Sequence, residues 1–179
     1  MHRPFTAFVE GPSDARFFDR IVKPNLRKVY APISVVEYAH LPDRIVNGFI
    51  RTLNSSGEGY VLLCDVDDYA CVPSRLDSIT GRHPELPRNK VQVVVREIEG
   101  WYLAGVSRQH CHRLKLRASK LSKGTNELTK ENLSSFREQD SPLSVIELMT
   151  SICGCFQIAL ARQRNRSFNR FCSRFLPGV

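Results

Sequence analysis

The chain has 179 residues, of which 42% are hydrophobic and 25% charged, and this balance excludes a disordered or fibrous protein. A chain of this length forms one domain, or one domain with an extension, and its net charge of +8 favours a polyanionic partner. No stretch approaches the roughly 18 apolar residues that span a bilayer, and no signal peptide is recognisable. We therefore expect a cytoplasmic protein that makes no membrane contact.

Strands alternate with helices over the first 96 residues. Strands are expected at residues 5–10, 33–38, 60–65 and 91–96, and helices at residues 14–28, 42–53 and 73–79. Ser13 is a candidate N-cap for the first of these helices. The alternation predicts an α/β fold with right-handed crossovers and a mainly parallel, four-stranded sheet flanked by helices.

The pattern becomes helical after the fourth strand. A short helix is expected at residues 99–106, and Ser144-Val-Ile-Glu147 has the spacing of a capping box that begins a long helix to about Arg164. Ser167 is expected to cap a last helix with a buried aromatic face. We divide the chain into an α/β core, residues 1–106, and a basic helical extension packed on it, residues 107–179.

The basic residues are concentrated in this extension. After Glu147 the chain has no acidic residue but five arginines, Arg162, Arg164, Arg166, Arg170 and Arg174. Such a distribution favours contact with the phosphates of DNA or RNA. A docking surface for an acidic protein and a merely solvated basic surface remain alternatives.

Acidic residues follow three of the four predicted strands. Glu10 follows the first strand, Asp65-Val-Asp67-Asp68 follows the third, and Glu97-Ile-Glu99 follows the fourth. The carboxyl ends of parallel strands meet at one edge of a sheet, so these acids are expected to form one cluster. Carboxylates without a nearby histidine suit a hard cation, Mg²⁺ or Mn²⁺.

The spacing of these acids suggests which of them share an ion. Asp65 and Asp67 lie two residues apart, so their side chains point to the same side of an extended chain and could hold one Mg²⁺, with Asp68 bound through water. Glu97 and Glu99 have the same relation and could hold a second ion. Lys90 and Arg96 are candidates for phosphate binding. The alternatives are that Asp68 is a plain loop residue and that Asp14 and Glu99 only begin helices.

These residues also resemble a TOPRIM domain, through Glu10-Gly11-x-x-Asp14 after the first strand and Asp65-x-Asp67 after the third. Residues 93–104 and 166–171 resemble segments of small TOPRIM-like families. Those families lie beside ABC-type ATPases in antiphage operons and are related to OLD nucleases and PARIS effectors. Gly105 stands where those families often have Asp, and no glycine follows the Asp-x-Asp pair, so the resemblance is to a divergent branch.

The resemblance implies a Rossmann-like TOPRIM fold and a magnesium-dependent nuclease that cleaves DNA or RNA, tRNA included. Glu10 would act as general acid/base or metal ligand, together with Asp65, Asp67 and Glu97. The protein would be the toxic effector of a defence system, controlled by an ABC- or OLD-type ATPase partner, and a homodimer is left open. Two alternatives remain: a non-catalytic adaptor that only binds the ATPase, and a metal-dependent phosphotransferase. No P-loop motif is present.

Overall fold

The computed structural model describes residues 3–117, 121, 125–137, 142–176 and 178. The chain forms two compact units, Met1–Val94 and Val95–Val179, and each is described by itself. The division falls before the boundary that we expected after residue 106, because helix α5 (Glu99–Ala104) packs on α8 (Val145–Cys153) and α9 (Ile158–Arg164) of the second unit.

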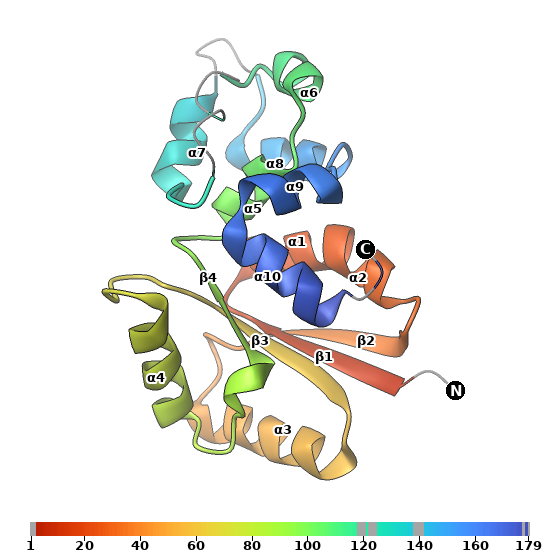
Figure 1. Ribbon diagram of the computed structural model, residues 1–179, viewed down its shortest axis with the longest axis vertical. Helices are drawn as coiled ribbons and strands as arrows, with labels where there is room; N and C mark the ends of the chain where they lie inside the picture. Colours follow the sequence, from red (N-terminus) through yellow and green to blue (C-terminus); the bar gives the residue numbers. More distant parts are fainter. Residues whose placement is uncertain (1–2, 118–120, 122–124, 138–141, 177, 179) are drawn as a thin grey trace. The chain divides into compact units, whose positions relative to one another are not determined.

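The first unit is built on a sheet of four strands, β1 (Arg3–Val9), β2 (Tyr30–Glu37), β3 (Gly59–Asp65) and β4 (Val91–Val94). The strand order is β2-β1-β3-β4, and every neighbouring pair is parallel (Figure 1). The predicted α/β fold with a four-stranded parallel sheet is therefore confirmed. The fourth strand ends two residues earlier than expected, at Val94.

Helices cover both faces of this sheet. The segments α1 (Pro12–Phe17), η1 (Phe18–Val22, a π-helix) and α2 (Lys23–Leu26) follow β1, α3 (Asp43–Ser56) follows β2, and α4 (Val72–Arg82) and η2 (Arg88–Lys90) follow β3. Figure 1 shows α1 and α2 on one face and α3 and α4 on the other. The expectation that Ser13 caps the first helix was wrong: Gly11 is the N-cap, and Pro12 takes the first helical position, which its fixed φ favours.

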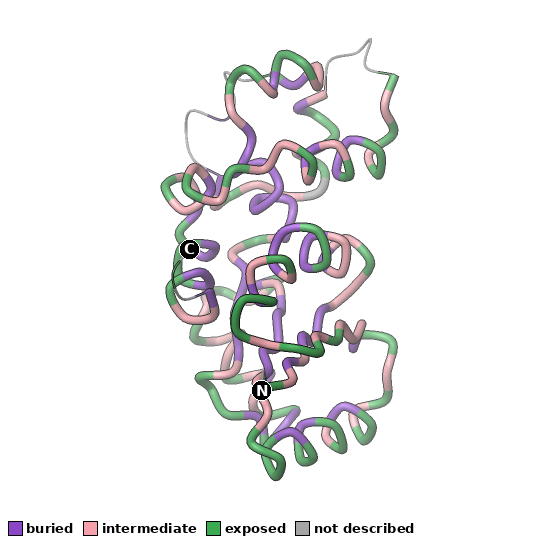
Figure 2. Tube along the Cα trace, turned by 90° about the vertical axis from the view of Figure 1, so that its right-hand side faces the viewer, coloured by how far each residue is buried: buried purple, intermediate pink, exposed green. Residues whose placement is uncertain are grey.

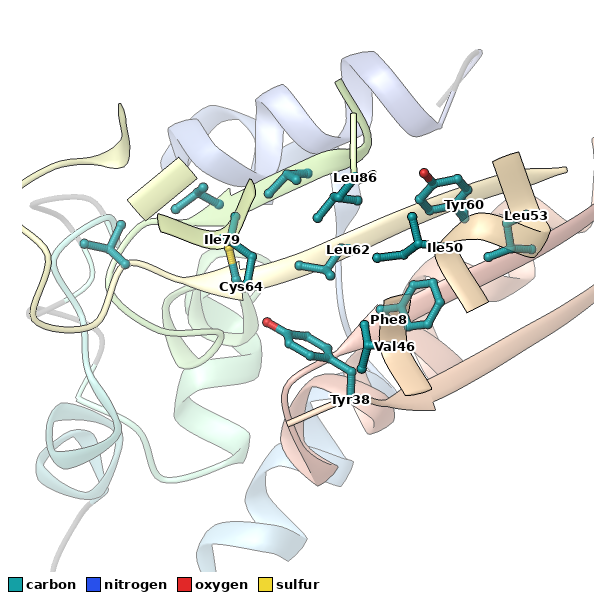
Figure 3. Close-up of a cluster of buried hydrophobic side chains, with 13 residues drawn as sticks. Phe8, Tyr38, Val46, Ile50, Leu53, Tyr60, Leu62, Cys64, Ile79 and Leu86 are labelled. Carbon is teal, nitrogen blue, oxygen red and sulfur yellow. The ribbon is translucent and has the colours of Figure 1, made fainter. Parts of the chain in front are cut away.

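A buried core lies between the sheet and helices α3 and α4. Phe8 of β1 and Leu62 of β3 pack against Val46 and Ile50 of α3 and Ile79 of α4, all fully or almost fully buried (Figure 3). Along α3, buried and exposed residues alternate with the turns of the helix (Figure 2). Burial of each such side chain contributes about 1.5–3 kcal/mol to stability, so this core anchors β1 and β3, the strands that carry Glu10 and Asp65 at their carboxyl ends.

The second unit is helical, with α6 (Arg108–Arg113), α7 (Lys130–Phe136) and α10 (Arg166–Phe175) in addition to α5, α8 and α9. The expected continuous helix from Ser144 to Arg164 was wrong, since α8 and α9 are separate helices bent by 114°. The capping box of Ser144 and Glu147 is present, whereas Asn165 and not Ser167 caps α10. Within the described residues, no single helix is both long enough and apolar enough to span a membrane. Of the described helices, only α8 and α9 taken together have that length and apolar character, and they are bent relative to each other.

Candidate metal centre

Three carboxylates meet at the carboxyl ends of two neighbouring strands. Glu10 directly follows β1, Asp65 is the last residue of β3, and Asp67 lies two residues further on. Each offers one oxygen atom, and these three oxygens lie within 4.8 Å of one another. Among the residues that the structure describes, this is the one group of three or more acidic, histidine or cysteine side chains that could hold a metal ion. The predicted convergence of these three acids is confirmed.

The strand order explains why a ligand site belongs at this place. The chain leaves β1 toward α1 on one face of the sheet and leaves the adjacent β3 toward α4 on the other face (Figure 1). Open α/β sheets bind ligands where the connections of neighbouring strands diverge in this way. Glu10 directly follows β1 and Asp65 ends β3. The three-acid centre, defined as Glu10, Asp65 and Asp67, therefore lies at the switch point of the fold.

The carboxylate of Glu10 is held by three hydrogen-bond donors. Its Oε1 accepts from the Tyr38 hydroxyl at 3.2 Å, from the backbone N–H of Asp65 at 3.3 Å and from Arg75 Nη2 at 2.8 Å. Tyr38 is buried, and its hydroxyl points toward the end of β3 that carries Cys64 (Figure 3). These donors fix the orientation of Glu10 in the centre.

Arg75, from the second turn of α4, is a member of the site that sequence reasoning missed. Its Nη2 also lies 3.1 Å from Asp67 Oδ2, and its Nε donates to the backbone carbonyl of Asp65 at 2.7 Å. The guanidinium lies over the Tyr69 ring, 5.1 Å from the centroid. One signal was available in the sequence, because Arg75 is the first basic residue after the acids of the third strand.

Burial decides the protonation of the groups around the centre. It raises the pKa of Glu10, and the neighbouring charge of Asp67 raises it further, while Arg75 opposes both effects. Burial also raises the pKa of the Cys64 thiol to about 12, so this neighbour stays neutral near pH 7. The available ligands are therefore carboxylate oxygens, the donor set that a hard divalent cation prefers, and the residues fit such an ion.

Two acids outside the three-acid centre, Asp68 and Asp14, differ in how far they are buried. Asp68 is exposed in the loop that follows Asp67. Asp67 itself has a left-handed backbone (φ 50°), which aspartate tolerates better than most residues. Asp14 is buried, and as the third residue of α1 it accepts a hydrogen bond from the backbone N–H of the N-cap residue Gly11 at 3.3 Å, which is the helix-beginning role expected as its alternative.

Glu97 and Glu99 belong to the second unit. Glu97 is half-buried just before α5, and Glu99 is the buried first residue of that helix, where its charge meets the positive end of the helix dipole. The role of Glu97 in catalysis and the binding of a second ion by both residues stay predictions.

The two basic residues expected near the acids have other partners. Lys90 lies just before β4, at the amino ends of the strands, and its Nζ is 5.2 Å from the centroid of the Tyr60 ring. The structure thus separates Lys90 from the three-acid centre at the opposite end of the sheet. Arg96 belongs to the second unit, has a left-handed backbone (φ 60°) and pairs with Glu127 at 3.1 Å.

The C-terminal arginines differ in their side-chain contacts and in their exposure to solvent. Arg162 donates from Nε to Asn169 Oδ1 at 2.9 Å, and Arg174 packs over the Phe175 ring at 5.0 Å. Arg166 and Arg170 are exposed on successive turns of α10. These two side chains are therefore the best placed of the set to meet a polyanion.

Comparison with protein-family models, with curated proteins and with solved structures found no match. The resemblance to TOPRIM proteins therefore stays a prediction from the motifs.

Proposed function

We propose that this protein is a magnesium-dependent nuclease whose ion is held by Glu10, Asp65 and Asp67. The observation that carries the proposal is the convergence of three carboxylate oxygens within 4.8 Å at the ends of adjacent parallel strands. An all-oxygen donor set at this point of an α/β sheet is suited to Mg²⁺, or to Mn²⁺ in its place.

The chemistry of the site fits hydrolysis of a phosphodiester. A bound Mg²⁺ would supply charge stabilisation at a phosphoryl oxygen and acidify a water molecule. In the cation-free protein, burial and the charge of Asp67 raise the pKa of Glu10, whereas a bound Mg²⁺ would favour the carboxylate form that acts as its ligand. Tyr38 keeps its proton, because burial raises its pKa, and so it donates to Glu10 and orients it.

The charge distribution supports a nucleic acid as substrate. The second unit has 14 lysines and arginines against seven acidic residues, a formal charge of +7, and the first unit has the remaining +1. A basic surface together with an acidic metal centre suits a nuclease, because the cationic side chains bind the phosphate backbone while the carboxylates bind the metal. Arg166 and Arg170 would make such contacts. The roles of toxic effector and of ATPase-controlled protein are proposed from the resemblance alone.

One observation favours a second candidate, the non-catalytic adaptor. Arg75 already supplies a positive charge to the acidic cluster, and a cluster with an internal counter-ion needs no metal for its stability. In that case the three acids and Arg75 would be a structural network at the end of the sheet. A phosphotransferase would use the same ion and differ only in the acceptor of the phosphoryl group.

End-labelled DNA and RNA, single- and double-stranded and including tRNA, test the proposal. We expect cleavage with Mg²⁺ or Mn²⁺, none with EDTA, and a loss of at least about 100-fold in Glu10→Gln and Asp67→Asn. Asp43→Asn is the control, because Asp43 is an acid of the same unit that pairs with Arg82 at the surface. Cleavage that survives EDTA and both variants would contradict the proposal. Absence of both Mn²⁺ binding and cleavage would favour the adaptor, whereas Mn²⁺ binding without cleavage of any of these substrates would favour the phosphotransferase.

A further inference from the structure

Arg75 places a positive charge at the position where a cation would bridge the acids. One nitrogen atom, Nη2, contacts both Glu10 Oε1, at 2.8 Å, and Asp67 Oδ2, at 3.1 Å. Two carboxylates repel each other at this separation unless a positive charge lies between them. The guanidinium therefore does for this pair of acids what a bound metal ion would do.

Arg75 is fixed in this position from several sides. Its Nε is bonded to the carbonyl of Asp65, its guanidinium lies over the Tyr69 ring, and 13% of its side chain is exposed. Tyr69 is itself held to α4 by a hydrogen bond of 2.6 Å between its hydroxyl and Ser78 Oγ. Arg82 at the other end of α4 differs, since it pairs with Asp43 while 53% of its side chain is exposed.

The contacts of Arg75 oppose the binding of a second cation. Oε1 of Glu10 already accepts from three donors, whereas a carboxylate oxygen has two lone pairs. A divalent ion and a guanidinium that share the same two carboxylates also repel each other strongly in a partly buried site.

We propose that Arg75 is an internal competitor of the divalent cation. In the cation-free protein it closes the three-acid centre as a counter-ion, and it thereby lowers the affinity of the centre for the ion. Cation binding then requires the contacts of Nη2 with Glu10 and Asp67 to be given up. This inference rests on the proposed metal centre and adds to it an inhibitory contact that is built into α4.

Mn²⁺ binding to the full chain tests the inference, measured from the electron paramagnetic resonance signal of the free ion. Arg75→Gln keeps hydrogen-bonding capacity but removes the charge, and we expect it to bind Mn²⁺ at least about tenfold more tightly than the wild type. Arg82→Gln is the control: it removes a different arginine of α4, one that pairs with Asp43, and it should bind Mn²⁺ as tightly as the wild type does. Arg75→Lys keeps the positive charge but lacks the planar guanidinium that contacts both acids. We therefore expect its Mn²⁺ affinity to lie between those of the wild type and Arg75→Gln.

The possible outcomes separate this inference from the metal centre itself. Equal Mn²⁺ affinity in the wild type and Arg75→Gln would overturn the competition and leave the metal centre standing. Weaker binding in a folded Arg75→Gln would also overturn it, because Arg75 would then hold the acids in a binding arrangement. Absence of binding in all four proteins would contradict the metal centre as well. Circular dichroism shows whether each variant is folded, and if Arg75→Gln is not, tighter binding by Arg75→Lys supports the competition and unchanged or weaker binding overturns it.

Discussion

Trp101 and Ser167 are joined by a hydrogen bond between the indole Nε1–H and Oγ, 2.8 Å long and fully buried, across 66 positions of the sequence. Ser167 in turn donates to Asn165 Oδ1 at 2.8 Å, and Asn165 Nδ2 donates to the carbonyl of Thr125 at 3.2 Å. The Trp101 ring packs against Phe168 and Phe171. The residues around Trp101 and Ser167 that resemble TOPRIM-like families thus build one core of the second unit.

Ser167→Ala should destabilise the second unit. The variant removes the acceptor of a buried indole N–H and a donor to Asn165, and buried groups that lose a partner cost about 1–3 kcal/mol. Urea unfolding followed by tryptophan fluorescence measures the effect, because Trp101 is the single tryptophan. Ser173→Ala, an exposed position of the same helix, should change the free energy of unfolding by less than about 0.5 kcal/mol. Equal effects of the two variants would argue against the network.

Gly105→Ala should also destabilise the second unit, because a Cβ atom at this position would overlap the Phe156 ring. Such overpacking costs about 1–3 kcal/mol. The same contact explains why an aspartate does not fit here, where the TOPRIM-like families that the sequence resembles often have one. Gly48→Ala is the control of opposite sign, since its Cβ would meet nothing within 4 Å in the middle of α3 and should add up to about 1 kcal/mol. Thermal unfolding distinguishes the two directions.

The pH dependence of stability reports on Glu10. Its pKa is raised above the ordinary 4.5, so just above pH 4.5 the folded protein binds more protons than the unfolded chain. Stability from this group is therefore greatest at acidic pH and falls as the pH rises from 4.5 through the raised value. The free energy of unfolding of the wild type minus that of Glu10→Gln should decrease over this range. A difference that increases with pH would mean that Arg75 outweighs burial and Asp67.

Nucleic-acid binding should depend steeply on salt. If Arg166 and Arg170 neutralise two phosphates, replacing both by alanine should reduce the log–log slope by about 1.4–1.8, at 0.7–0.9 per phosphate. Arg51→Ala is the control, because Arg51 is an exposed residue of the first unit that pairs with Glu85. Fluorescence anisotropy at several salt concentrations provides the slopes. An unchanged slope in the double variant would favour docking of an acidic protein or a solvated surface.

The sheet and the ends of its strands could be predicted because both depend on local patterns. An apolar run such as Tyr60–Cys64 indicates a strand buried on both faces, and parallel pairing then brings Glu10 and Asp65 to one edge. The break between α8 and α9 could not be predicted from periodicity. Buried residues such as Ile152 and Ala161 continue the apolar stripe across it. In a continuous helix the Gln157 N–H would donate to the Cys153 carbonyl, but here it donates to the Gly105 carbonyl at 2.9 Å.

Arg75 shows why the candidate site was predicted only in part. The carboxylates stand at strand ends, which a sequence pattern identifies, but the direction of a long side chain depends on how α4 packs on the sheet. Its partners Glu10 and Asp67 precede it by 65 and 8 positions, so its place as the first basic residue after the acids of the third strand does not by itself predict either contact. Tyr38 was missed for the same reason, since its contact with Glu10 spans 28 positions.

Anomalous diffraction from crystals grown with Mn²⁺ tests the central claim most directly. We predict one anomalous peak within bonding distance of carboxylate oxygens of Glu10, Asp65 and Asp67, with Arg75 Nη2 moved away from Glu10 and Asp67. The peak should be lost in Asp65→Asn crystals grown in the same way. A wild-type map without a peak at this position, in which Arg75 still bridges Glu10 and Asp67, would contradict the metal centre and leave a structural ion-pair network.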